Sequence, residues 1–264
     1  MSNPVFFTLA GTLDGQQPGS QFVLEGPEAR HAVTVKRLAV GEPVDIADGS
    51  GKRMTGIVTS AAPSALTVEC RALEVEDRPG IRLVLVQALA KGDRDELAAE
   101  TATELGIDAV IPWQSERSIV RWKGERAAKA HAKWQSVVTA AAKQARRAWI
   151  PEVRDAVDTA ALQRTVSAAD LAIILHEDAV RPLRQVLESW HNSNPDLELR
   201  DGADGAGARE VLLIVGPEGG ISPREVTKLC DAGAVTALLG NHVLRSSTAG
   251  PAATVLASDV LGRW

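Results

Sequence analysis

Residues 211–225 read Val-Leu-Leu-Ile-Val-Gly-Pro-Glu-Gly-Gly-Ile-Ser-Pro-Arg-Glu, and this segment is the strongest indication of the fold class. Its five leading apolar residues predict a strand that is buried on both faces of a sheet. The glycine-rich loop then leads into a helix. Ser222 is a good N-cap for it, Pro223 suits its first turn, and Glu225 stands where a capping box needs it. A buried strand, a glycine loop and a capped helix in this order indicate an α/β domain.

The loop from Gly216 to Gly220 is the first candidate binding site. Glycines at the carboxyl end of a strand let the backbone approach a ligand closely, and α/β sheets bind small molecules at that end. The loop lacks the Gly-Lys-Ser/Thr of a phosphate-binding loop and the Gly-x-Gly-x-x-Gly of a dinucleotide fold. Taken alone, it fits either a ligand-binding loop or a plain tight turn.

Strands and helices alternate along the chain from residue 81 to residue 264. Helical patterns separate the apolar runs, notably at 93–105 and 125–146. This alternation predicts a parallel sheet covered on both faces. Residues 192–209 are rich in Asn, Asp and Gly and predict a surface loop or insertion. The runs that predict buried strands are 81–88, 109–112, 171–175, 211–215 and 235–239.

The first 73 residues predict a separate, small β-rich domain. Short alternating runs at 44–47, 54–60 and 65–72 indicate strands, with hairpin-turn chemistry in Asp48-Gly49-Ser50-Gly51. One helix is expected over 27–38. Residues 74–80 are polar, end in Pro-Gly and predict a linker. The expected domains are therefore 1–73 and 81–264.

The overall composition is that of a globular, cytoplasmic protein. Of its 264 residues 45% are hydrophobic and 24% charged, which excludes a wholly disordered chain. Cys70 and Cys230 have no metal-site spacing, so we expect reduced thiols and no metal. The N-terminus lacks a basic leader, and no stretch approaches the roughly 20 apolar residues of a membrane span, so we expect no membrane contact.

Positive charge gathers in one block although the net charge is −5. Glu125 is the only acid in this block, which predicts either a phosphate-contacting face or a solvated helix surface. Trp113, Trp122, Trp134 and Trp149 surround it; stacking on bases is one reading, and core packing is the preferred one. The cations of the block are Arg117, Arg121, Lys123, Arg126, Lys129, Lys133, Lys143, Arg146 and Arg147.

A second loop follows the strand predicted at 235–239, with Arg245 set among apolar residues. An arginine there would stabilise negative charge on a reacting group or hold a phosphate. A structural ion pair is the alternative. The loop reads Leu239-Gly240-Asn241-His242-Val243-Leu244-Arg245.

Together, the two loops resemble those of the SPOUT methyltransferases, and more narrowly those of the RsmE family. That family methylates N3 of a uridine in 16S ribosomal RNA of the small subunit. The resemblance covers nearly the whole chain, because further blocks match in order. These are His31 with Val35-Lys36-Arg37, Asp48-Gly49, Gln87 to Arg94, Thr103 to Gly106, Ser115 to Ser118, and Gln144, Arg147 and Pro151.

The resemblance implies a fold, a cofactor and partners. The N-terminal domain would be a PUA-like RNA-binding β-barrel. The C-terminal domain would be a SPOUT-type α/β domain with a trefoil knot that holds S-adenosyl-L-methionine. The partners would be the small ribosomal subunit with its 16S RNA, and a second copy of the chain in a homodimer.

The resemblance also implies the site residues. Arg245 would be catalytic. The cofactor would contact Leu175, His176, Glu177, Gly216, Pro217, Glu218, Gly219, Gly220, Leu239, Gly240, Val243 and Leu244. RNA would contact His31, Arg37, Lys91, Arg94, Glu116, Arg117 and Arg147. Glu116 would either contact the base or fix Arg117, and the second role is preferred.

Several positions depart from the family pattern. Ser247 stands where relatives often carry an acid, His242 where an arginine is common, and Lys143 where a glutamate is common. We therefore assign no general base. These departures leave open a non-catalytic RNA-binding or ribosome assembly protein, and an enzyme using another nucleotide is a further alternative. Gly250-Pro251 early in the last helix is also unusual, and Pro251 is tolerable there only if it lies in the first turn.

Overall fold

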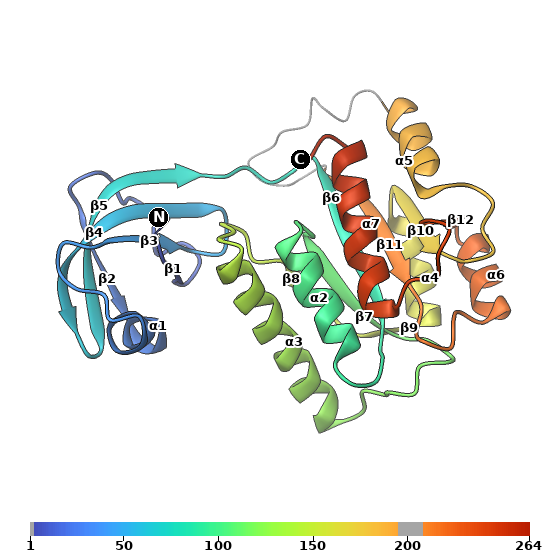
Figure 1. The fold of residues 1–264 in the computed structure, drawn as a ribbon, viewed down its shortest axis with the longest axis horizontal. Coiled ribbons are helices and arrows are strands. Elements are labelled where there is room, and N and C mark those ends of the chain that lie inside the picture. The colour runs from blue at the N-terminus through green and yellow to red at the C-terminus, as the bar shows by residue number, and fades with distance from the viewer. Residues whose placement is uncertain (1–2, 195–207) are drawn as a thin grey trace. The chain divides into compact units, whose positions relative to one another are not determined.

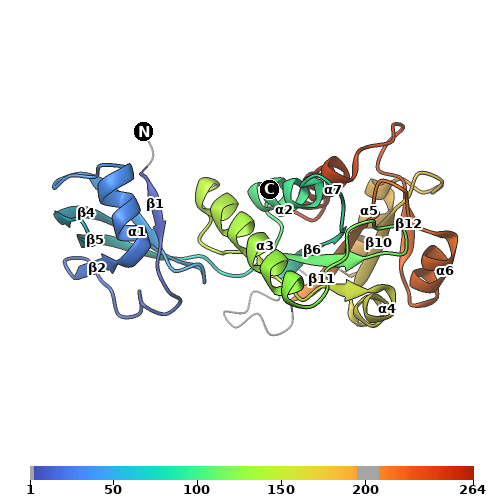
Figure 2. The same ribbon diagram turned by 90° about the horizontal axis from the view of Figure 1, so that it is seen from below.

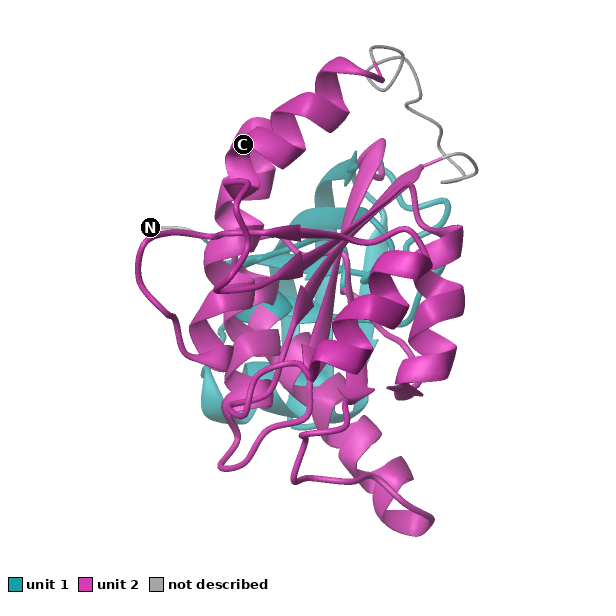
Figure 3. Cartoon of the chain, turned by 90° about the vertical axis from the view of Figure 1, so that its right-hand side faces the viewer, with its two compact units in different colours: residues 1–77, 142–150 teal, residues 78–141, 151–264 magenta. Residues whose placement is uncertain are grey.

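The computed structural model describes residues 3–194 and 208–264 (Figure 1). Most of the surface loop expected at 192–209 lies outside the described residues. The chain forms two compact units (Figure 3): Met1–Asp77 with Ala142–Ile150, and Arg78–Ala141 with Pro151–Trp264. The sequence had assigned residues 142–150 to the C-terminal domain; in the structure they belong to the first unit.

The first unit is built on a five-stranded sheet. Its strands are antiparallel except for the first pair, and a tight turn at Gly49 to Gly51 joins two of them, as predicted. The large apolar side chains Phe6, Ile46, Met54 and Leu66 are fully buried in its core. In sheet order the strands are β1 (Val5–Phe7), β3 (Pro43–Ala47), β4 (Lys52–Ala62), β5 (Ala65–Val75) and β2 (Gln21–Glu25).

The helix predicted over 27–38 is shorter and changes its winding. It runs as α1 (Gly26–Arg30) and continues as one π-helical segment, His31–Val35. Glu28 accepts hydrogen bonds from the Phe7 N–H at 3.0 Å and from Lys143 Nζ at 2.6 Å. Lys143, which departs from the family pattern, therefore ties residues 142–150 to the first unit.

The second unit contains an entirely parallel sheet. The strands predicted at 81–88 and 171–175 have those bounds, and the other three differ by up to two residues at an end. Strands β8 and β9 were not predicted. In sheet order the strands are β12 (Val235–Ala237), β10 (Leu171–Leu175), β11 (Arg209–Val215), β6 (Ile81–Ala88), β7 (Ala109–Gln114) and β8 (Glu152–Val153), with β9 (Val157–Asp158) beside β7.

Helices cover both faces of this sheet, as predicted (Figures 1 and 2). Val84 and Val86 point toward Leu162 and Leu229 of α4 and α6, whereas Leu85, between them, meets Gly250 of α7. The helices of this unit are α2 (Arg94–Glu104), α4 (Thr159–Ala168), α5 (Leu183–Asn192), α6 (Pro223–Asp231) and α7 (Ser246–Val260), with most of α3 (Glu125–Gln144).

The expectation that Pro251 is tolerable only in the first turn of its helix is wrong. Helix α7 starts at Ser246, so Pro251 is its sixth residue and lies in the second turn. It is buried there, and its missing N–H removes the helical hydrogen bond to the Ser247 carbonyl. Within residues 3–194 and 208–264, no helix is long and apolar enough to cross a membrane. Cys70 and Cys230 are both free thiols.

Candidate functional site

A pocket of about 830 Å³ opens at the carboxyl ends of β10, β11 and β12. This is the edge of a parallel sheet where ligands are expected. The two loops singled out in the sequence form opposite parts of its wall, and the start of α7 closes it. All twelve residues expected to contact a cofactor line the pocket: Leu175, His176, Glu177, Gly216, Pro217, Glu218, Gly219, Gly220, Leu239, Gly240, Val243 and Leu244.

The glycine loop is built for close backbone approach. A Cβ on Gly216 would lie 2.6 Å from the side chain of Ile221, so this position admits no larger residue without a shift. Gly220 has a φ of 72° and closes a turn on the Pro217 carbonyl at 2.9 Å. The predicted capping box is confirmed: Ser222 Oγ accepts from the Glu225 N–H, and Glu225 accepts from the Ser222 N–H.

Two arginines hold the outer side of this loop. Arg117 Nη1 donates to the Gly219 carbonyl at 2.8 Å, and Arg94 Nη1 pairs with Glu218 Oε1 at 3.0 Å. Both side chains also line the pocket. The resemblance assigns both arginines to RNA; the structure places both exposed side chains against the glycine loop, at the rim of the pocket.

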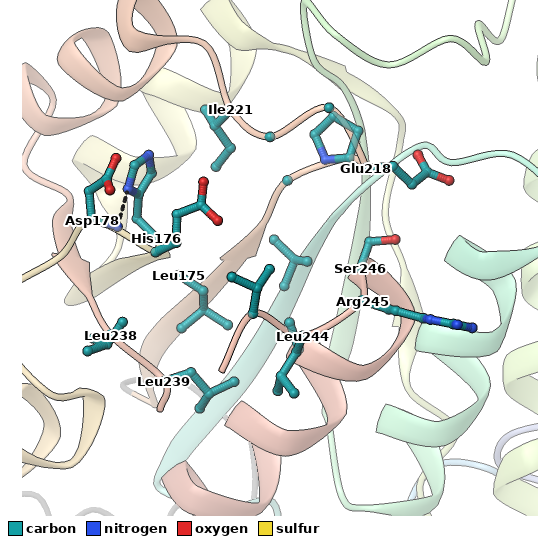
Figure 4. A pocket seen from close by; sticks show the side chains of 18 of the residues that line it. Leu175, His176, Asp178, Glu218, Ile221, Leu238, Leu239, Leu244, Arg245 and Ser246 are labelled. Atoms are coloured by element: carbon teal, nitrogen blue, oxygen red, sulfur yellow. Dashed lines mark hydrogen bonds between the residues drawn. The ribbon is translucent and has the colours of Figure 1, made fainter. Parts of the chain in front are cut away.

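The pocket has an apolar floor between two polar sides (Figure 4). Leu175, Leu239 and Leu244 lie along the floor, while His176 lies on one side, where its Nδ1 accepts from the Asp178 N–H at 3.2 Å. Glu218, Arg245 and Ser246 gather on the other side. Such a cavity suits a flat apolar ring at the centre and charged or polar groups at one end.

Arg245 occupies the N-cap position of α7, and its side chain is exposed. In the described parts of the chain, no acid or carbonyl pairs with its guanidinium. The alternative of a structural ion pair therefore has no support there. A cation left unpaired beside a pocket is available to a bound molecule.

Ser246 is a pocket residue that the sequence did not single out. It is 8% exposed, and its hydroxyl has no hydrogen-bond partner among the described residues. It is also the first residue of α7, where backbone N–H groups lack helical acceptors. A serine at a helix start normally indicates a cap, which explains why its place in the pocket wall was missed.

The preferred role of Glu116, fixing Arg117, is not what the structure shows. The Glu116 carboxylate accepts from Ser222 Oγ at 2.7 Å, and the Glu116 N–H donates to Glu225 Oε1 at 2.8 Å. Arg117 reaches Gly219 instead. The prediction failed because the partner lies more than a hundred residues away in the sequence.

The other residues assigned to RNA lie outside this pocket. His31, Arg37 and Arg147 belong to the first unit, and Lys91 is an exposed residue ahead of α2. His31 packs edge-on against the Phe6 ring, with centroids 5.9 Å apart.

The basic block is partly neutralised, and its tryptophans are mostly structural. Lys133 pairs with Glu96 at 2.7 Å. Trp113 and Trp134 are essentially buried, and the Trp122 and Trp134 rings meet edge to face at 5.6 Å. The preferred reading of core packing is confirmed for these three.

Comparisons with known proteins agree on one family. The family model described as an RNA methyltransferase domain matches residues 77–258, and the model described as an RNA methyltransferase PUA domain matches residues 24–69. Ribosomal RNA small subunit methyltransferase E of Mycobacterium bovis is 37% identical over 93% of this chain and 89% of that protein. The Bacillus subtilis protein of the same name is 28% identical over 86% of each.

Solved structures with the same fold carry related titles. A ribosomal RNA small subunit methyltransferase E from Neisseria gonorrhoeae, bound to S-adenosyl methionine, has a TM-score of 0.76 at 26% identity over 98% of each chain. A methyltransferase from Legionella pneumophila in complex with the same cofactor has a TM-score of 0.79 at 25% identity over 98% of each. This chain belongs to the ribosomal RNA small subunit methyltransferase E family of RNA methyltransferases.

Proposed function

We propose that this protein is a methyltransferase that uses S-adenosyl-L-methionine to methylate N3 of a uridine in 16S ribosomal RNA. The observation that carries the proposal is the pocket, in which every residue expected to contact the cofactor lines one cavity beside the unpaired Arg245. The names of the family relatives, and the cofactor bound in the Neisseria and Legionella structures, support the same conclusion.

The pocket fits the proposed cofactor in size and chemistry. Its volume is within the range of roughly 300–1,000 Å³ that small-molecule sites occupy. Leu175, Leu239 and Leu244 supply apolar surface for an adenine ring, and the tight approach at Gly216 exposes backbone groups that can hydrogen-bond it. The bound cofactor supplies a methyl group on a sulfonium, and the protein's task is to align the acceptor with it.

Arg245 is the residue to which we assign catalysis. Uridine N3 is a weakly acidic imide that must lose its proton before or during attack, and the negative charge then spreads onto a carbonyl oxygen. An unpaired guanidinium at the polar end of the pocket would stabilise that charge. Ser246 lies on the same side of the pocket, and its unpartnered hydroxyl would help Arg245 to stabilise that charge. We assign no general base, since Ser247, which is buried, stands where relatives often carry an acid.

The remaining family properties are part of the same proposal. We propose a PUA-like RNA-binding barrel over residues 1–73, to which residues 142–150 return, a linker over 74–80, and a SPOUT domain with a trefoil knot over the rest of 81–264. A homodimer acting in the cytoplasm on the small ribosomal subunit is proposed with them. His31, Arg37 and Arg147 would contact RNA from the first unit, and Lys91, Arg94 and Arg117 from the second.

One rival function has a specific observation behind it. Ser247 and His242 depart from the family pattern, which a non-catalytic RNA-binding or assembly protein would tolerate. Calorimetric titration with S-adenosylhomocysteine, compared with NAD and ATP, tests the cofactor. Transfer of a labelled methyl group to small-subunit RNA tests turnover. Cofactor binding without transfer would favour the rival, and preference for another nucleotide would overturn the proposal.

A further inference from the structure

Glu225, near the start of α6, is a fully buried carboxylate whose hydrogen bonds reach beyond its own helix. Its Oε1 accepts from the Thr159 hydroxyl at 2.6 Å and from the Glu116 N–H at 2.8 Å. Its Oε2 accepts from the Ser222 N–H at 3.3 Å. A capping box needs only this last contact, which is the longest of the three. The two shorter bonds go to the start of α4 and to the loop after β7.

Helix capping does not account for this arrangement. In the described parts of the chain, the donors to the Glu225 carboxylate are two backbone N–H groups and one hydroxyl, with no cation among them. Burying a carboxylate without a cation is costly. Helix α4 shows that a carboxylate can cap a helix without being buried, because its N-cap Asp158 accepts from the Ala161 N–H at 2.7 Å while remaining exposed.

The bonds of Glu225 lead to the rim of the pocket. Glu116 is held twice: its N–H by Glu225, and its carboxylate by Ser222 Oγ at 2.7 Å. The next residue is Arg117, whose guanidinium bonds the Gly219 carbonyl at 2.8 Å. Glu225 therefore anchors both the backbone from which Arg117 extends and the end of the loop that Arg117 contacts.

We propose that Glu225 is a positioning residue that fixes Arg117 against the glycine loop. Arg117 then meets an RNA phosphate at the rim only when the cofactor loop is in its folded position. Glu225 touches neither the cofactor nor the reacting atoms and acts through Arg117. The inference rests on the proposed function, since it assigns Arg117 to RNA.

A double-mutant cycle tests this coupling, with Glu225→Gln, Arg117→Ala and the double variant. We expect Glu225→Gln to lower kcat/KM for small-subunit RNA about tenfold or more, with S-adenosylhomocysteine affinity within about threefold of wild type. The double variant should be no worse than Arg117→Ala, within about twofold. Losses that multiply, or a matching loss of S-adenosylhomocysteine affinity, would overturn the proposal.

Asp170→Asn is the matched control. Asp170 is an exposed residue just before β10, outside the pocket lining; it accepts from the Glu210 N–H at 2.9 Å and pairs with Arg209. The variant therefore removes a hydrogen-bonded carboxylate without changing the pocket. It should keep wild-type kcat/KM. A loss equal to that of Glu225→Gln would show that removing a carboxylate far from the pocket has the same effect, and would also overturn the proposal.

Hydrogen exchange supplies a readout that does not depend on activity. The Glu116 amide should exchange faster in Glu225→Gln than in wild type, and at the wild-type rate in Asp170→Asn. Unchanged exchange in Glu225→Gln would overturn the positioning role. A wild-type protein that fails to methylate RNA would instead count against the proposed function, while the exchange result still stood.

Discussion

Arg245 is the single residue on which the proposed catalysis depends most. Its guanidinium stands at the entrance to α7 with no partner in the described residues, on the polar side of the pocket. The sequence singles it out as an arginine among apolar residues, with an ion pair as the alternative, and the resemblance adds the catalytic role. Whether any residue pairs with its guanidinium depends on residues distant in the sequence, and so only the structure could show that none of the described residues does.

Replacing Arg245 by Ala should remove charge stabilisation in the transition state and leave cofactor binding intact. We expect kcat to fall about 100-fold or more, a typical effect of losing one such group. Affinity for S-adenosylhomocysteine should stay within about threefold, because the apolar floor and glycine loop are unchanged. Single-turnover methylation and calorimetry measure the two quantities.

Arg184→Ala is a suitable control, because Arg184 is an exposed arginine that pairs with Asp259 outside the pocket. It should turn over at the wild-type rate. If the Arg245→Ala variant turned over at the wild-type rate, Arg245 would have no catalytic role.

At the scale of elements, the sequence predicted long buried strands well and short ones poorly. Strands β6 and β10 have the predicted bounds because their continuous apolar runs leave no alternative. Strands β1, β8 and β9 have two or three residues each, too few for any periodicity to show. By local rules, proline is tolerated only in the first turn of a helix. Pro251 lies in the second turn of α7, which packs tightly against the sheet.

Gly250 marks that tight packing. A Cβ there would lie 2.8 Å from Leu85 Cδ1, so α7 can approach β6 this closely only with glycine. Gly250→Ala should lower the free energy of unfolding by about 1–3 kcal/mol, the usual effect of overpacking. Denaturant titration measures it. An increase of about 0.5–1 kcal/mol, as alanine gives at an open helix site, would mean that the contact is loose.

Glu210 on β11 pairs with Arg82 on the neighbouring strand β6 and with Arg154 just after β8. Burial raises its pKa, but hydrogen bonds and charge from Arg154, with charge from Arg82, outweigh burial and lower the pKa below its ordinary value of 4.5. Asp170 opposes this more weakly. A lowered folded pKa means that the ionised carboxylate stabilises the fold above pH 4.5. That contribution is lost as the pH falls through the folded pKa.

Glu210→Gln should therefore lower the free energy of unfolding at pH 7 by about 2 kcal/mol, as expected for charged hydrogen bonds that are partly shielded from water. The difference from wild type should shrink steadily below pH 4.5. Denaturant titrations at pH 7 and at successively lower pH measure it. An equal difference at every pH would show that shape, rather than charge, is what Glu210 contributes.

At the scale of the whole molecule, the sequence predicted the ligand edge of the sheet from local patterns and its ligand from the resemblance. It could not predict contacts that close over long stretches of chain. Residues 142–150 return to the first unit, and Glu225 reaches Glu116 across 109 positions. Such contacts leave no periodic trace in the sequence, because each partner alone has an ordinary local role.

Nucleoside mass spectrometry of 16S RNA tests whether this protein transfers a methyl group to uridine N3. Small ribosomal subunits that lack the modification would be incubated with the protein and S-adenosyl-L-methionine, and their 16S RNA digested and analysed. We expect new N3-methyluridine with the wild-type protein and none with Arg245→Ala. No methylated nucleoside, or a methyl group on any other atom, would contradict this expectation.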